Sequence, residues 1–209
     1  TVVGVLSGAT IRDSEYLVAF ADAAMYQAKH SGKNTWRVYR ADQDTTPEML
    51  HRLTWNARLS DAIAQDRFEL HFQGVHRLQD TGIAHLEALI RLRDPDTDTL
   101  VPPGVFIPIA EKSPKIVELD RWVLRRVIMM LAERPRMPAV AVNLSGRSFD
   151  DPAMPGYISD LLREHGVEPR RLLLEITETA AVSDLTDAQR FIESIRKTGC
   201  RVCLDDFGA

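Results

Sequence analysis

Four short apolar runs, each carrying an oxygen-bearing side chain, constrain the fold of this chain most. Glu87 lies among leucine, isoleucine and alanine within residues 85–91, and we expect it to stand at the end of a buried strand. Three later runs end in Asn143, in Glu175 and in the pair Asp205 and Asp206. Short apolar runs that end in polar residues are typical of buried strands in a parallel sheet. The last three runs follow one another at intervals of about 30 residues, and each interval suits one strand–helix–strand step. Since barrel sites collect at the carboxyl ends of parallel strands, the pattern predicts one site at the mouth of a barrel.

The first strand pair is expected to run in opposite directions. Residues 68–73 alternate between polar and apolar and precede a turn at residues 79–82, which leads into the Glu87 run. A connection this short joins only antiparallel strands, because a parallel crossover needs about a dozen residues or more. Helices are predicted between the later strands: one zone from Pro102 and Pro103, then residues 116–131, 157–165 and 187–198.

The predicted site is rich in hard oxygen donors. Carboxylate and amide oxygens favour magnesium or manganese over zinc, and no histidine or thiolate is expected beside them at the site-facing strand ends. Adjacent aspartates let Asp205 bridge to a second ion that Asp206 also holds, as in two-metal phosphoester cleavage. Arg91, four residues after Glu87 and on the same strand face, would grip a phosphate. The alternative for any one of these acids is an ordinary ion-pair or capping role, but five donors from four strands favour a site.

Composition excludes several classes of function. The net charge is −4, with 26 basic and 30 acidic residues spread along the chain, so no basic footprint for duplex DNA or RNA is expected. No apolar run reaches the roughly 18 residues of a membrane-spanning helix, and we expect a cytoplasmic protein.

Cys200 and Cys203 form a C-x-x-C pattern that could indicate zinc or redox chemistry. On a strand they would point to opposite faces, which favours buried free thiols.

The first 40 residues resemble the last helix and strand of a GGDEF domain. The resemblance rests on ADAAMYQAK (21–29) followed by SGKN (31–34). It implies that Lys29 and Lys33 stand where the family contacts nucleotide phosphates; two solvated lysines at a helix end are the alternative. The signature loop of that family would lie upstream of Thr1, so no cyclase activity is expected. We interpret residues 1–40 as a C-terminal remnant of an α+β GGDEF domain and residues 41–51 as a linker.

From about residue 52 onward the chain resembles the EAL phosphodiesterase family, through motifs in the family's order. These are EALIR (87–91), FIPIAE (106–111), RWVL (121–124), VNLS (142–145), LEITE (174–178) and LDDFG (204–208). The resemblance implies a (β/α)8 barrel with an antiparallel first strand and hydrolysis of cyclic di-GMP to linear pGpG with Mg²⁺ or Mn²⁺.

The same resemblance implies a role for each matching residue. Glu87, Asn143, Glu175 and Asp205 would bind one metal ion, and Asp206 would bind a second, with Glu87, Asp205 and Asp206 at the centre of catalysis. Arg91 and Gln73 would contact the substrate. Glu178 would brace the loop after the fifth strand.

Two departures from the family pattern shape the expectation. Gly74 stands where the family usually has proline. The chain also stops at Ala209, about three βα units short of a barrel of roughly 250 residues, without the family's general-base lysine. We therefore interpret residues 52–209 as the first part of an EAL domain with about five strands, from a GGDEF–EAL tandem parent. The parent is expected to be the active enzyme and a homodimer through its EAL domain, and this fragment is expected to be inactive. The alternative is a receptor that binds cyclic di-GMP without cleaving it.

Overall fold

The computed structural model describes residues 47–95, 97–177 and 185–205. The chain divides into two compact units, residues 1–58 and residues 59–209. The segment interpreted as a GGDEF remnant, with Lys29 and Lys33, lies outside the described residues. Helix α2 (Pro47–Ala64) begins within the segment interpreted as a linker, and the predicted boundary at residues 51 and 52 falls inside this helix.

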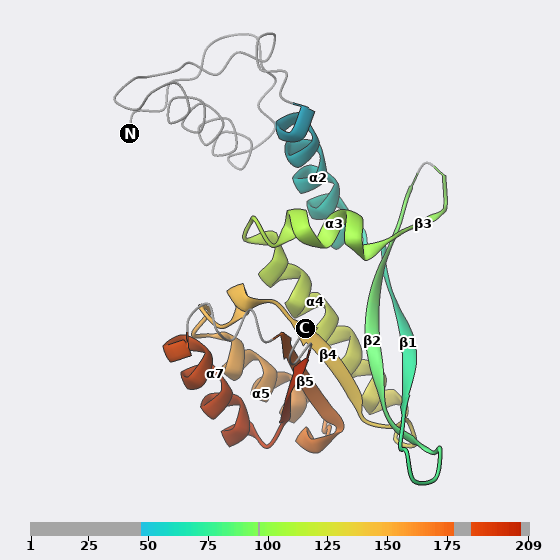
Figure 1. Cartoon of the computed structure of the whole chain (residues 1–209), viewed down its shortest axis with the longest axis vertical. Coiled ribbons are helices and arrows are strands. Elements are labelled where there is room, and N and C mark those ends of the chain that lie inside the picture. Colours follow the sequence, from blue (N-terminus) through green and yellow to red (C-terminus); the bar gives the residue numbers. More distant parts are fainter. Residues whose placement is uncertain (1–46, 96, 178–184, 206–209) are drawn as a thin grey trace. The chain divides into compact units, whose positions relative to one another are not determined.

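The second unit is built on a mixed β-sheet (Figure 1). Within the described residues the sheet has six strands, in the order β1-β2-β4-β5-β6, with β3 paired to β2. The strands are β1 (Phe68–His76), β2 (Ile83–Arg93), β3 (Leu100–Val101), β4 (Val140–Leu144), β5 (Leu172–Thr177) and β6 (Arg201–Asp205). β1 and β2 form the predicted antiparallel hairpin, and β2, β4, β5 and β6 run parallel, as predicted. The short strand β3 was not predicted.

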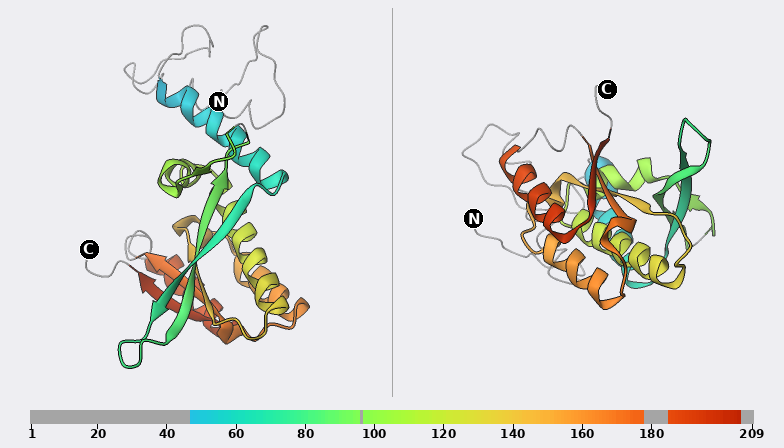
Figure 2. Two further views of the ribbon diagram at one scale, coloured as in Figure 1. Left: turned by 90° about the vertical axis from the view of Figure 1, so that its right-hand side faces the viewer. Right: turned by 90° about the horizontal axis from the view of Figure 1, so that it is seen from below.

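The predicted helices are present between the parallel strands. They are α3 (Pro103–Ala110), α4 (Lys115–Glu133), α5 (Met154–Glu164) and α7 (Leu185–Thr198), with 3-10 turns η1 (Gly146–Ser148) and η2 (Pro169–Arg171). Figure 2 shows α4, α5 and α7 gathered on one side of the parallel strands. Among the described helices, none combines the length and the apolar character needed to cross a membrane.

Alternation along the strands separates the face of the sheet that packs against the helices from the opposite face. Val140, Val142 and Leu144 of β4 are buried in the core formed with the helices, as are Leu172, Leu174 and Ile176 of β5. Successive side chains on a strand point to opposite faces, so the residues between them point away from the helices. Asn143 and Glu175 are among these, which places the predicted site on the face opposite the helices.

Candidate functional site

Strand pairing brings the predicted site residues onto one face of the sheet. Glu87 of β2 lies opposite Gln73 of β1 and opposite Ala141 of β4. Asn143, two residues beyond Ala141, lies opposite Glu175 of β5. Paired residues, and residues two apart on one strand, point to the same face. Gln73, Glu87, Asn143 and Glu175 therefore share the face opposite the helices.

Asp205 joins this set from the end of β6. Glu175 lies opposite Cys203, and Thr177 lies opposite Asp205, so Asp205 sits on the site face one step further toward the carboxyl ends of the strands. Asp206 and Glu178, the other acids predicted for the site, lie outside the described residues.

Contacts between these side chains link the strands across the site face. The Asn143 amide donates a hydrogen bond from Nδ2 to Glu87 Oε1 at 2.8 Å. Burial, together with the nearby Glu87 and Asp205 carboxylates, raises the pKa of the Glu175 carboxyl to about 7. Like charges this close disfavour ionisation of one another. The site thus holds acids whose full ionisation needs a compensating positive charge.

Glu87 lies in the middle of its strand, and the expectation that it ends the strand was wrong. β2 continues to Arg93 because β1 and β3 both pair with its second half, at Leu92 for example. Its parallel pairing with β4 is much shorter and covers only Leu86 to Ala88. Relative to the parallel part of the sheet, Glu87 is nevertheless close to the carboxyl end, where the other donors lie.

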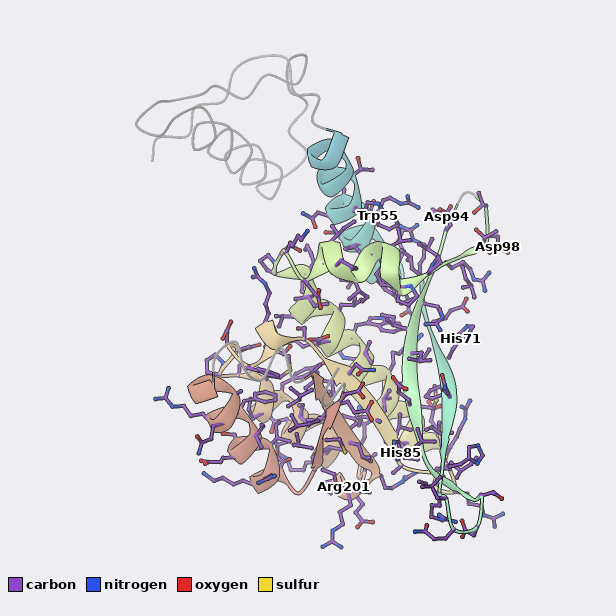
Figure 3. All side chains as sticks on the ribbon, in the orientation of Figure 1. Trp55, His71, His85, Asp94, Asp98 and Arg201 are labelled. Carbon is purple, nitrogen blue, oxygen red and sulfur yellow. The ribbon has the colours of Figure 1, made fainter. Side chains whose placement is uncertain are left out.

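A histidine and a thiol also occupy the site face, contrary to the prediction that neither would accompany the oxygen donors. His85, which is labelled in Figure 3, lies two residues before Glu87. Its Nε2 is 3.8 Å from Glu175 Oε1. Cys203 lies opposite Glu175 and is half-buried, while Cys200 is buried. The sequence did carry a signal for His85 and Cys203. His85 lies two residues before Glu87 and Cys203 lies two residues before Asp205, and residues two apart on a strand share a face.

The two predicted substrate contacts lie on the first two strands. β2 persists past Arg91, so this residue shares the face of Glu87, as the prediction required. Its Nη1 donates to the carbonyl of Ile90 at 2.8 Å. Gln73 is exposed on β1 directly opposite Glu87.

The donor set fits a hard divalent cation by its chemistry. Three carboxylates and one amide from four strands supply the oxygens that Mg²⁺ and Mn²⁺ prefer. Among the described side chains, no three His, Cys, Asp or Glu residues are grouped so that they could hold a metal ion by themselves. The predicted ligand set also contains the amide of Asn143, and it contains Asp206, which lies outside the described ranges.

The fold and the site define an α/β domain with a mixed sheet that presents acids at the carboxyl end of its parallel strands. The sequence profile of the EAL domain family matches residues 56–209. The chain belongs to this family.

Curated relatives match more than nine-tenths of this chain. An uncharacterized signaling protein of Caulobacter vibrioides is 36% identical over 94% of this chain and 24% of its own length. MucR of Pseudomonas aeruginosa, a bifunctional diguanylate cyclase/cyclic di-GMP phosphodiesterase, is 31% identical over 92% of this chain and 28% of its own length. The chain thus spans about a quarter of the length of these relatives.

Solved structures of EAL proteins have the same fold. The MucR phosphodiesterase in complex with c-di-GMP gives a TM-score of 0.68 at 28% identity, covering 75% of this chain and 64% of that one. The Xanthomonas citri FimX EAL domain in complex with c-diGMP gives 0.68 at 32% identity, covering 76% and 62%. The mixed sheet with an antiparallel first strand therefore matches part of the TIM-like EAL fold.

Proposed function

We propose that this EAL domain takes part in the hydrolysis of one phosphodiester bond of cyclic di-GMP, releasing linear pGpG. One observation carries the proposal: Glu87, Asn143, Glu175 and Asp205 arrive from four strands on one face of the sheet. The MucR relative, named as a cyclic di-GMP phosphodiesterase, supports the choice of substrate.

The acids and the amide would hold divalent cations. Glu87, Asn143, Glu175 and Asp205 would bind one Mg²⁺ or Mn²⁺, and Asp205 with Asp206 would bind a second. Such ions activate water as a nucleophile at neutral pH and stabilise the charge that develops on phosphate oxygens. The raised pKa of Glu175 supports this assignment, since a cation would relieve the repulsion among the three carboxylates.

The remaining predicted residues would act on the substrate and the loop. Arg91 would turn its guanidinium from the carbonyl of Ile90 to a phosphate of the dinucleotide, where it can donate two parallel hydrogen bonds. Gln73, opposite Glu87, would contact the substrate from β1. Glu178 would brace the loop after β5.

The wider organisation is part of the proposal. We infer a GGDEF–EAL tandem arrangement, a cytoplasmic location and a homodimer formed through the EAL domain. The tandem arrangement rests on the motifs at residues 21–34 and on the naming of MucR as bifunctional. The chain covers 64% and 62% of the two solved EAL chains, so we expect little turnover from residues 1–209 alone.

A receptor that binds cyclic di-GMP without cleaving it is the second candidate. The FimX EAL domain in complex with c-diGMP and the MucR phosphodiesterase match this chain with the same TM-score, 0.68, and FimX does so at 32% identity. Arg91 and the strand acids would serve either role. The two candidates differ in whether pGpG is released.

The decisive experiment measures pGpG release from cyclic di-GMP by the complete gene product, with Mg²⁺ and with a chelator. Removing an outer-shell partner of a metal typically costs about 10–100-fold, so Glu175→Gln, which removes a direct ligand, is expected to lose at least about 100-fold. Glu193→Gln, on the exposed side of α7, is the charge-matched control and should keep full activity. Turnover that survives both Glu175→Gln and the chelator would refute the assignment. Tight binding with no pGpG release from the wild type would establish the receptor instead.

A further inference from the structure

A buried carboxylate on helix α4 holds the turn that follows strand β4. Asp120 is only 6% exposed, and its Oδ2 accepts three hydrogen bonds. The donors are the backbone N–H of Ser145 at 3.0 Å, the hydroxyl of Ser145 at 2.6 Å and the hydroxyl of Ser148 at 2.6 Å. Ser148 is fully buried in η1. One oxygen thus gathers the first polar groups that the chain presents on leaving the sheet.

These hydrogen bonds begin where the strand ladder stops. The last β4–β5 pair joins Leu144 to Ile176, and Ser145 is the next residue. A backbone N–H that leaves a sheet in a buried setting needs a new acceptor, which Asp120 supplies. The carboxylate therefore sets the residue at which β4 ends.

Asn143 lies two residues before this anchor. Its backbone is held by β5 on one side, and its amide reaches Glu87 Oε1 at 2.8 Å across the site. Leu144, between the two, is packed into the core at 4% exposure. A shift of the Ser145 turn would therefore be transmitted to Asn143 through one tightly packed residue.

The use of a charged group here is costly for folding. Burial raises the pKa of the Asp120 carboxyl to about 6, although the hydrogen bonds from Ser145 and Ser148 act in the opposite direction. Taking an ion out of water has a large cost in free energy. A short, charge-assisted set of three hydrogen bonds does, however, fix geometry more tightly than packing alone.

We propose that Asp120 is a positioning residue, which fixes the turn at Ser145 and Ser148 and thereby the direction of the Asn143 amide at the site. The importance of that direction for cation binding rests on the proposed function. The positioning itself does not, because it concerns contacts within the chain.

The test follows the side-chain amide resonances of Asn143 in the ¹⁵N-labelled chain, assigned by their loss in Asn143→Asp. Asp120→Asn and Ser145→Ala are expected to shift both Nδ2 proton resonances and to reduce the difference between them, as the hydrogen bond to Glu87 weakens. Ser145→Thr keeps the hydroxyl and should leave them in place. Ile158→Val, a conservative core change in α5, is the control for general destabilisation and should also leave them in place.

Two results would overturn the positioning role. One is an unchanged Asn143 amide in Ser145→Ala, a variant that removes a single oxygen and keeps the test valid even where Asp120→Asn fails to fold. The other is an equal shift in Ile158→Val.

Titration with Mn²⁺ separates this inference from the proposed function. We expect the concentration that half-broadens the Asn143 resonances to rise at least about 10-fold in Asp120→Asn, as for other residues that orient metal ligands. Absence of broadening in the wild type would refute the cation site while leaving the positioning of Asn143 to be decided by the resonances alone. Equal Mn²⁺ affinity in wild type and Asp120→Asn would refute the proposal that Asp120, by positioning Asn143, contributes to cation binding.

Discussion

The carboxyl group of Asp120 makes the stability of the fold depend on pH at the scale of one residue. Burial raises its pKa from 3.8 to about 6 in the native state. Between these values the native state keeps a proton that the unfolded chain has lost, so the free energy of unfolding falls as pH rises. The contribution should fall by on the order of 3 kcal/mol in total, most of it between about pH 4 and pH 6.

Urea denaturation of wild type and Asp120→Asn at several pH values isolates this effect. Glu69 and Asp80 have pKa values lowered by Arg93 and Arg77, and they act with the opposite sign over an overlapping range. The difference between the two proteins cancels those terms. We expect this difference to shift steadily from pH 4 to pH 6; a difference independent of pH would contradict the native-state proton on Asp120.

Asp120 also marks the limit of inference from sequence at this scale. The apolar runs that carry Glu87, Asn143, Glu175 and Asp205 are local patterns and predicted one shared site, and the pairing of the strands places these residues on one face. The hydrogen bonds of Asp120 join residues 25 and 28 positions apart. No local pattern predicts such partners, and the contact of His85 with Glu175 was missed for the same reason.

At the scale of elements, the C-terminus of α4 depends on an arginine from outside the helix. The last turn of α4 contains no basic residue. Arg171 of η2 instead donates to three carbonyls, those of Leu131 at 2.8 Å, Arg134 at 2.9 Å and Met137 at 3.1 Å. A guanidinium satisfies the free carbonyls of a helix end and complements its dipole. It thereby ties the start of β5 to the helix that covers β4.

Arg171→Met should therefore lower the free energy of unfolding by about 2 kcal/mol, since hydrogen bonds from a charged donor contribute about 1.5–3 kcal/mol. Arg171→Lys should recover only part of this, because a single ammonium lacks the planar fork that reaches several carbonyls. Arg170→Met, at the exposed neighbouring position, is the matched control and should be nearly neutral. Equal urea midpoints for Arg170→Met and Arg171→Met would exclude the capping role.

For the whole molecule, the order and direction of the main strands were predictable and the detail of β2 was not. A short turn forces an antiparallel hairpin, and spacings of about 30 residues suit parallel steps. Connection lengths therefore predicted the antiparallel β1–β2 pair and the parallel β4–β5 and β5–β6 steps. The central position of Glu87 in β2 depends on pairing of the second half of β2 with β1 and, at Leu92 and Arg93, with β3, a strand of only two residues. So short a strand has no periodicity in sequence, and tertiary pairing alone defines it.

We expect the acids of the site to couple the stability of the whole fold to divalent cations, and Glu175→Gln tests this expectation with two opposite effects. Without added metal the variant should unfold at a higher temperature than wild type, because it removes repulsion with Glu87 and Asp205 and the cost of ionising a buried carboxyl. A ligand that binds only the native state at 100 times its Kd adds about 2.7 kcal/mol. Mg²⁺ or Mn²⁺ should therefore raise the melting temperature of the wild type and of Glu193→Gln, reversibly with chelator, but not that of Glu175→Gln. Sodium chloride at matched ionic strength controls for screening. An equal rise in all three proteins would mean that the ions act elsewhere on the chain, and the site proposed here would lose its metal.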